Sequence, residues 1–336
     1  MNSREKVMQI FQHKGEEGAM WTGHPSEDIL PILADAWHID GRREAVYRYL
    51  QDDCRWFMAD GCYRHPEGRP AFDASYGMGA RETLSAAGCF ADAENVAEIE
   101  AYPWPNPAYC DFAPLYQEID RFADKMVFTG MWSPFFHIVA DFFGMEEFFV
   151  KMYTAPAVVE AAIEKTVDFF VAANERFFAE LGDRADVMFF GNDLGTQRDM
   201  ILSPVLFRQF LLPSIKRIIA VGKKHNKKIM MHSCGSIHKI IPDLIEAGVD
   251  ILHPIQAQAV GMDAESLACY KNDLAFVGGI DAQTFFVNAS PEEVKREVYR
   301  VKERLGASIV ISPSHEEILP NVPPQNLLAM AEAARR

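Results

Sequence analysis

Short apolar runs that alternate with longer segments of helical period constrain the fold of this chain more than any other feature. Such runs are typical of parallel strands buried on both faces, and their alternation with helices indicates repeated βα units. Two looser candidates, 19–23 and 55–59, lie in the amino-terminal third. The six clearest runs follow from residue 125 onward, at 125–130, 186–191, 228–232, 249–253, 274–278 and 307–312.

The segments between these runs carry helix start signals. Ser-Pro pairs open the expected helices 204–225 and 291–305, and the pair Pro323-Pro324 opens the last one. A serine caps the first amides of a helix, and a proline fits its first turn. Eight strands in 336 residues, each followed by a helix, fit a TIM (β/α)8 barrel better than an open sheet. We therefore predict an α/β protein with a single TIM-barrel domain over 1–336, an amino-terminal extension and a long loop insertion at 61–107.

Charge and composition exclude several classes of protein. The 33 Lys and Arg residues stand against 48 Asp and Glu, a net charge of −15, which argues against binding to nucleic acid or to an anionic membrane surface. No window approaches the roughly 18 unbroken apolar residues of a membrane span, and the first residues lack the apolar core of a signal peptide. The six cysteines lie far apart, so we expect reduced thiols and a cytoplasmic protein.

The sharpest local pattern is Met-Met-His-Ser-Cys-Gly at 230–235, where a strand ends and a glycine turn follows. Residues two apart on a strand point to the same side, so His232 and Cys234 would present an imidazole and a thiolate together at the barrel mouth. These two donors suit Zn²⁺. A core histidine beside a buried thiol is the alternative, because two ligands do not make a site.

A third ligand must come from another strand end, and His315 follows the last expected strand. Its loop can reach across the mouth, which predicts a His-Cys-His set with a fourth position left for substrate, as a catalytic zinc site requires. The alternative is an ordinary loop histidine beside Glu316 and Glu317.

Asp193 emerges at the carboxyl end of the expected strand 186–191. This position suits general acid or base catalysis, ligand orientation or a hydrogen bond to a metal-bound histidine. A turn aspartate that bonds nearby amides is an equally good interpretation.

Five other side chains expected near the mouth are predicted to bind substrate. They are Trp21, His24, Gln197, Gln256 and Asp281. For Trp21 the alternative is a core position, because an aromatic residue at such a place is more often core.

Several motifs in the second half of the chain resemble those of the uroporphyrinogen decarboxylase family. They are His-Ser-Cys-Gly-Ser at 232–236, Pro-Ile-Gln at 254–256, Gly-Gly-Ile-Asp at 278–281, Ser-Pro-Ser-His at 312–315 and Asn-Val-Pro-Pro-Gln-Asn at 321–326. The likeness extends back through 192–197, and it is loose in the first half. The resemblance implies a TIM barrel.

The family includes haem-pathway decarboxylases and zinc-dependent methyltransferases that work with a corrinoid protein. His232 and Cys234 match the His-x-Cys pair of the methyltransferases, and His315 stands where those members have a cysteine. The decarboxylases carry an arginine-rich segment near the amino terminus, whereas this chain has Glu27 and Asp28 there. A polycarboxylate substrate needs compensating cations, so the chain is more similar to the methyltransferases.

The resemblance therefore implies an enzyme that uses Zn²⁺ to move a methyl group between a small donor and the cobalt of a corrinoid carried by a small partner protein. An aryl methyl ether, methanol and a methylated thiol are the candidate donors. The sequence leaves open the direction of transfer and permits a homodimer. The alternatives are a uroporphyrinogen decarboxylase and a non-catalytic barrel that binds a corrinoid or tetrapyrrole.

Overall fold

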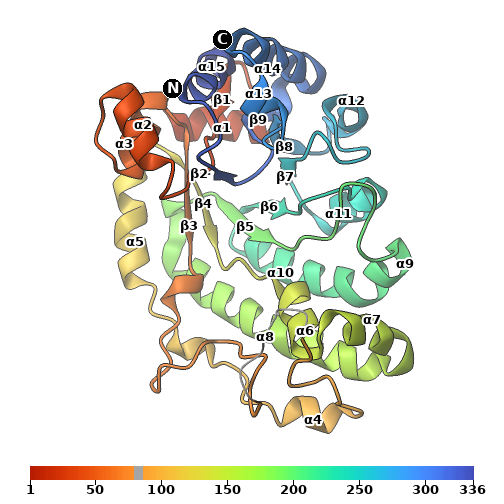
Figure 1. Ribbon diagram of the computed structural model, residues 1–336. Coiled ribbons are helices and arrows are strands. Elements are labelled where there is room, and N and C mark those ends of the chain that lie inside the picture. Colours follow the sequence, from red (N-terminus) through yellow and green to blue (C-terminus); the bar gives the residue numbers. More distant parts are fainter. Residues whose placement is uncertain (79–85) are drawn as a thin grey trace.

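Eight parallel strands form the centre of the computed structural model, which describes residues 1–78 and 86–336 (Figure 1). Their spatial order is β1-β9-β8-β7-β6-β5-β4-β3, and the predicted TIM-like α/β barrel is confirmed. The strands are β1 (Ala19–Met20), β3 (Cys54–Met58), β4 (Met126–Gly130), β5 (Val187–Gly191), β6 (Lys228–His232), β7 (Ile251–Ile255), β8 (Ala275–Ile280) and β9 (Ile309–Pro313).

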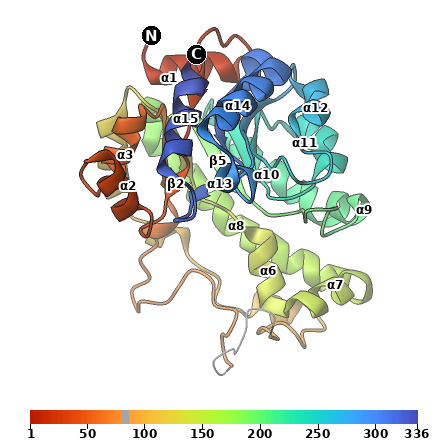
Figure 2. The ribbon, with the colours of Figure 1, turned by 45° about the horizontal axis from the view of Figure 1, so that its top comes forward.

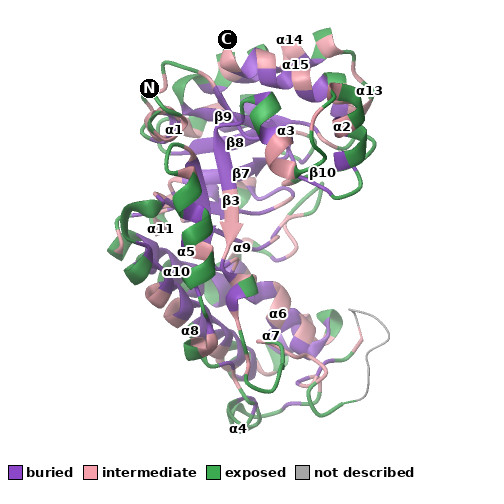
Figure 3. Cartoon of the chain, turned by 90° about the vertical axis from the view of Figure 1, so that its left-hand side faces the viewer, coloured by how far each residue is buried: buried purple, intermediate pink, exposed green. Residues whose placement is uncertain are grey.

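Alternate residues of each strand face opposite sides of the barrel wall. In β5, Phe189 belongs to the cluster inside the barrel, whereas Met188 and Phe190 pack outward against the helices. The same alternation puts Met230 inside the barrel and Met231 outside it. Most strand residues are buried (Figure 3), which explains why the strands appear in the sequence as continuous apolar runs.

The barrel closes between β1 and β3 through side chains, because these two strands are not paired with each other in the described structure. Asp52 accepts hydrogen bonds from the amides of Thr22 (2.6 Å) and Cys54 (2.8 Å). Asp53 accepts one from the amide of Met20 (3.1 Å) and donates its own amide to the Met20 carbonyl (3.2 Å). Two adjacent carboxylates and one backbone hydrogen bond thus replace a strand ladder at this seam.

The amino-terminal extension forms α1 (Ser3–Phe11), which covers the amino-terminal end of the barrel. Its apolar face, Val7, Ile10 and Phe11, belongs to the interior cluster. Asn2 and Glu5 begin the helix with a capping box, which satisfies amides of the first turn. The helix fills the end of the barrel away from the strand carboxyl ends, so any substrate site is left to the opposite mouth.

Helices surround the strands, and α8, α10, α14 and α15 contact them directly. The helices are α2 (Leu30–Trp37), α3 (Arg43–Leu50), α4 (Val96–Glu100), α5 (Ala113–Ile119), α6 (Phe135–Phe143), α7 (Met145–Thr154), α8 (Pro156–Leu181), α9 (Pro204–Leu206), α10 (Leu212–Lys224), α11 (Ile241–Ala247), α12 (Ala264–Leu267), α13 (Phe285–Asn288), α14 (Pro291–Leu305) and α15 (Pro324–Arg335).

The long insertion lies in the connection from β3 to β4, and its described part runs beside α6, α7 and the first half of α8 (Figure 2). Phe90 of the insertion packs against α6: its ring centre lies 4.9 Å from that of Phe142 and 5.8 Å from that of Phe143. Because β3 and β4 lead into these segments from their carboxyl ends, the insertion and α6–α7 extend the molecule on the side of the mouth.

Several expected elements differ from those observed in their bounds or helix type, and three of the differences have a clear local cause. The helix expected at 204–225 contains a π-helical turn at Phe207–Leu211, because Pro213 has no amide to continue the α-helical ladder. The first strand ends at Met20, because the Thr22 amide donates to the Asp52 carboxylate and not to a neighbouring strand. The strand expected at 249–253 begins two residues later, because the Val249 amide still bonds to Leu244 at the end of α11.

Within residues 1–78 and 86–336, no helix is both long and apolar enough to cross a bilayer.

The seam yields a prediction about stability. Asp52→Ala leaves two buried amides without an acceptor, and each such group costs about 1–3 kcal/mol. We expect the free energy of unfolding in urea to fall by at least about 2 kcal/mol. Asp35→Ala, on the exposed face of α2, is the control and should stay within about 0.5 kcal/mol of the parent. Equal stability of the two variants would contradict closure by Asp52.

Candidate metal centre

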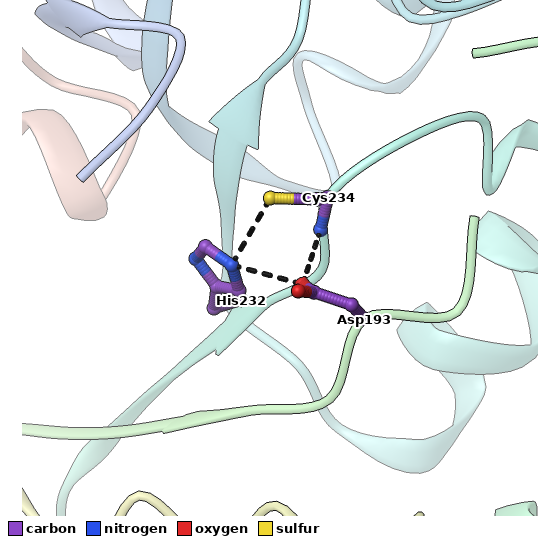
Figure 4. A group of neighbouring side chains, drawn as sticks. All are labelled: Asp193, His232 and Cys234. Atoms are coloured by element: carbon purple, nitrogen blue, oxygen red, sulfur yellow. Dashed lines mark hydrogen bonds and ion pairs between the residues drawn. The ribbon is translucent and has the colours of Figure 1, made fainter. Parts of the chain in front are cut away.

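Three side chains with metal-binding atoms converge at the carboxyl ends of β5 and β6 (Figure 4). His232 is the last residue of β6, Cys234 lies in the turn that follows, and Asp193 lies in the loop after β5. The Nε2 atom of His232 is 3.4 Å from Cys234 Sγ and 3.1 Å from Asp193 Oδ1. All the donor atoms lie within 4.8 Å of one another, and the two-residue spacing places His232 and Cys234 on one side as predicted.

The distances fit a tetrahedral ion. With zinc about 2.0–2.3 Å from each donor, tetrahedral angles separate neighbouring nitrogen, sulfur and oxygen donors by about 3.4–3.6 Å. The observed separations from His232 Nε2, 3.4 Å to sulfur and 3.1 Å to oxygen, are close to these values. Imidazole, thiolate and carboxylate are also the ligand types that zinc takes in proteins. The residues therefore fit a zinc ion without a change of strand positions.

His253 fixes the orientation of the His232 ring. The two Nδ1 atoms are 2.9 Å apart, so one of them must donate. A histidine that offers Nε2 to a metal carries its proton on Nδ1, and His253 then accepts at Nδ1 and carries its own proton on Nε2. Burial and the charge of His232 lower the pKa of His253 well below its usual value, which keeps this ring neutral. His253 is not among the site residues that the sequence predicts, because its partner His232 lies on the neighbouring strand.

Two glycines allow the loops after β5 and β6 to touch. Gly235 has φ of +80°, and a Cβ on it would overlap the backbone of Gly195 and lie 2.7 Å from the Thr196 amide. A Cβ on Gly195 would lie 2.6 Å from the Ser236 amide. This close backbone contact brings Asp193 to the Cys234 amide, which donates to Asp193 Oδ1 at 2.9 Å. The glycine turn thus positions the carboxylate as well as the thiol.

The electrostatics of the group favour a cation. Burial, followed by the charges of Asp193 and Glu316, raises the pKa of the Cys234 thiol. Burial also works against the ionised form of Asp193, but the hydrogen bond and charge of His232 outweigh it and lower the pKa of that carboxyl. A divalent cation stabilises thiolate and carboxylate alike, so it would relieve the repulsion that the side chains create on their own.

His315 lies outside this group. Its side chain is 44% exposed, its Nδ1 accepts a hydrogen bond from the amide of Glu317 (3.0 Å), and its Nε2 is 3.8 Å from Glu316 Oε2. The neighbouring Glu316 points inward instead, with Oε2 at 3.9 Å from His232 Nε2. The sequence placed Glu316 only beside His315, because a loop of undefined shape does not reveal which of two successive side chains faces the mouth.

Comparison with known families decides the chain's affiliation. The family model described as Uroporphyrinogen decarboxylase (URO-D) matches residues 91–336, which is well over half of the chain. The chain belongs to the uroporphyrinogen decarboxylase family. Among curated proteins, none matches this chain.

Solved structures resemble this URO-D family protein in fold. A methyltransferase from Methanosarcina mazei superposes with a TM-score of 0.67 at 15% identity, and the match covers 99% of this chain and 98% of that chain. A putative vitamin-B12 independent methionine synthase from Listeria monocytogenes reaches a TM-score of 0.46 at 12% identity, covering 95% and 96%. A Xanthomonas albilineans dihydropteroate synthase reaches 0.32 at 17% identity, covering 45% and 55%. The first likeness establishes the shared fold, and the other two are too weak to support an argument.

Two predicted substrate residues of this URO-D protein lie apart from the metal donors. Trp21 is fully buried in the barrel interior, edge-on to Trp56 and Phe128, which is the core position considered above as the alternative. His24 lies in β2 (His24–Pro25), edge-on to Trp56, and lines a cavity of about 310 Å³ that also includes Arg43.

The other three lie in loops around the mouth. Gln256 Oε1 accepts from the amide of Gly235 at 2.5 Å, which ties the loop after β7 to the metal donors. Gln197 Nε2 donates to Gln283 at 3.3 Å. Asp281 accepts from the amides of residues 283, 284 and 285, so its carboxylate organises the start of α13.

A cavity of about 330 Å³ lies among the loops that follow β7, β8 and β9, and Gln256 in its wall bonds to Gly235, the residue after Cys234. Gln256 and His315 lie in its wall together with apolar side chains. The residues that line it are Gln256, Ala282, Gln283, Ser314, His315, Glu317, Leu319, Asn321 and Val322.

The glycine contact yields a prediction with a matched control. Gly235→Ala and Gly68→Ala both place an alanine at positive φ, +80° and +74°, but only the first adds a Cβ where other atoms lie within 4 Å. The backbone strain common to both is about 1–2 kcal/mol. We expect Gly235→Ala to lower the free energy of unfolding by at least about 1 kcal/mol more than Gly68→Ala. Equal losses in urea denaturation would show that the loops do not need the close contact.

Proposed function

We propose that this URO-D family protein is a zinc-dependent methyltransferase that moves a methyl group between a small donor and the cobalt of a corrinoid protein. One observation carries the proposal: an imidazole, a thiol and a carboxylate lie within 4.8 Å of one another at the carboxyl end of the barrel. In a TIM barrel this end is where chemistry takes place. A thiol beside an imidazole and a carboxylate is a ligand set for zinc.

His232, Cys234 and Asp193 would hold the ion. Zinc, when bound, supplies a Lewis acid that stabilises negative charge on the oxygen or sulfur that holds the methyl group. His253 keeps the His232 ring in the tautomer that offers Nε2, through the 2.9 Å contact between their Nδ1 atoms. Gly235 and Gly195 keep the thiol and the carboxylate at a fixed separation. These residues align charges before the reaction begins, which lowers the cost of reorganisation.

The 330 Å³ cavity, which is linked to the turn of Cys234 through Gln256, suits the methyl donor. Its volume, about 330 Å³, is at the lower end of the roughly 300–1,000 Å³ of small-molecule sites. Leu319 and Val322 give it apolar walls, and Gln256, Gln283 and Asn321 offer amide groups. We propose an aryl methyl ether as the donor, since apolar walls accommodate the ring and the amides bond to its oxygen substituents. Methanol and methylated thiols are the smaller alternatives.

The same cavity argues against the decarboxylase alternative. Uroporphyrinogen carries many carboxylates, which need cationic partners. None of the residues that line the 330 Å³ cavity is Lys or Arg. Arg43, Arg55 and Arg121 line the separate cavity near His24; Arg43 is paired with Glu27, Arg55 with Glu44, and Arg121 lies over the ring of Phe122. The lack of cations in the wall of the 330 Å³ cavity therefore favours a neutral substrate there.

In the demethylating direction, the methyl–oxygen bond of the donor breaks and the methyl group passes as a formal cation to cobalt(I), which becomes cobalt(III). The leaving oxygen retains the electron pair of the broken bond until it takes up a proton. The chain contributes alignment of donor and acceptor and stabilisation of the developing charge. The corrinoid arrives on a small partner protein that docks at the barrel mouth.

The proposal predicts that the protein, purified under reducing conditions, binds about one zinc ion per chain. With free cob(I)alamin as the acceptor and 2-methoxyphenol, methanol or dimethyl sulfide as donors, we expect conversion to methylcobalamin, followed by its absorption spectrum. Cys234→Ala should lose the metal and the activity. Cys269→Ala, at an exposed cysteine, should lose neither.

Other outcomes would contradict the proposal. Decarboxylation of uroporphyrinogen without transfer from any donor would establish the decarboxylase. Tight binding of cobalamin with neither reaction would indicate a non-catalytic barrel.

The pairing of His232 with His253 yields a separate prediction. Removal of the partner of a metal-bound histidine typically weakens metal affinity about 10–100-fold, so we expect a loss of this size for His253→Ala in competition with a chromogenic chelator. His38→Ala, at an exposed histidine at the end of α2, should bind zinc like the parent. An unchanged affinity in His253→Ala would refute the positioning role.

A further inference from the structure

Glu316 carries a buried oxygen that the rest of the described structure leaves without a hydrogen-bond partner. This atom, Oε2, lies 3.9 Å from His232 Nε2 and 3.8 Å from His315 Nε2, beyond hydrogen-bond distance in both cases. A buried carboxylate oxygen without a donor costs free energy, and native structures rarely contain one without a ligand or water. The orphaned oxygen is aimed at the same imidazole nitrogen that the other two donors surround.

Glu316 Oε2 lies beside, but outside, the group of three donors whose atoms are all within 4.8 Å of one another. Cys234 Sγ, Asp193 Oδ1 and Glu316 Oε2 lie 3.4, 3.1 and 3.9 Å from this nitrogen. The expected separation of donors on a tetrahedral zinc ion is about 3.4–3.6 Å. Glu316 also lies close enough to Cys234 for its charge to act on the thiol. Two carboxylates beside one imidazole repel each other and oppose ionisation of the Cys234 thiol, and a cation between them relieves both effects.

The backbone holds Glu316 in this position. Its carbonyl accepts from the His24 amide at 2.6 Å, and the next residues form β10 (Glu317–Ile318), which pairs with β2. Gly23, at φ +80°, allows the approach, since a Cβ there would lie 2.7 Å from the Glu316 carbonyl oxygen. On the preceding side, the Ser314 amide bonds to the Ile280 carbonyl at 2.7 Å. The loop is therefore tied on both sides of Glu316.

We infer that Glu316, rather than His315, is the residue that the loop after β9 supplies to the metal. The inference rests on the zinc site of the proposed function and adds a ligand to it. His315, with its side chain 44% exposed and in the wall of the 330 Å³ cavity, is left to contact substrate. The ligand set is then His232, Cys234, Asp193 and Glu316.

The test compares three single variants of the full chain. Glu316→Gln keeps the size of the side chain and removes its charge, and we expect at least about a tenfold loss of zinc affinity in competition with a chromogenic chelator. The visible absorption of the Co²⁺-loaded protein should change as well, because it depends on the donor set. Glu317→Gln, an exposed neighbour, and His315→Ala should each retain the affinity of the parent within about threefold.

A fourth variant, Glu316→His, separates ligation from folding. It restores a metal donor at the same place, so it should recover part of the lost affinity, whereas a merely misfolded loop would not recover. Loss of affinity in His315→Ala with parental binding in Glu316→Gln would overturn the inference. An absence of zinc binding by the parent chain, or unchanged binding by Cys234→Ala, would instead refute the proposed function from which the inference starts.

Discussion

The closure of the parallel sheet is the constraint on which the remaining structure depends. Only a closed barrel brings the carboxyl ends of all eight strands to one rim, so that loops distant in sequence can share a site. In the described structure, β1 and β3, where the barrel closes, are not joined by a strand ladder. Asp52 and Asp53 bind the amides of Thr22 and Met20, and these bonds hold β1 beside β3. The approach of the loop after β9 to the end of β6 follows from that closure.

Charge determines what the mouth can bind. The interior below it is closed by aromatic rings, among them Trp21 and Phe189, with ring centres 6.2 Å apart, and Trp132 packs 5.0 Å from the His232 ring. Above this apolar floor lie the partly exposed Asp193 carboxylate and Cys234 thiol and the buried Oε2 of Glu316. A cation, unlike a neutral ligand, stabilises both carboxylates and favours the thiolate. The polar end of an otherwise apolar barrel is thus suited to a metal ion with a small organic molecule beside it.

Membership of the uroporphyrinogen decarboxylase family does not by itself assign a reaction, because one fold supports different chemistry. The decisive features are local. A thiol in the turn after β6, an imidazole oriented by His253 at 2.9 Å, and a cavity wall without Lys or Arg are the features on which we base the proposal of metal-assisted transfer from a small donor instead of decarboxylation of a polycarboxylate. The methyltransferase from Methanosarcina mazei shares the fold at 15% identity, so these side chains carry the argument.

The sequence alone determined the barrel and the pair His232 and Cys234, because buried parallel strands leave continuous apolar runs and because a spacing of two is fixed by strand geometry. It also located Asp193 at a strand end. It could not distinguish His315 from Glu316, since neighbouring residues in a loop differ only in the direction that backbone torsions give them. The tertiary structure decided this through the bond of the Glu316 carbonyl to the His24 amide and the pairing of β10 with β2. The role of His253 likewise emerged only in three dimensions, because its partner comes from the neighbouring strand.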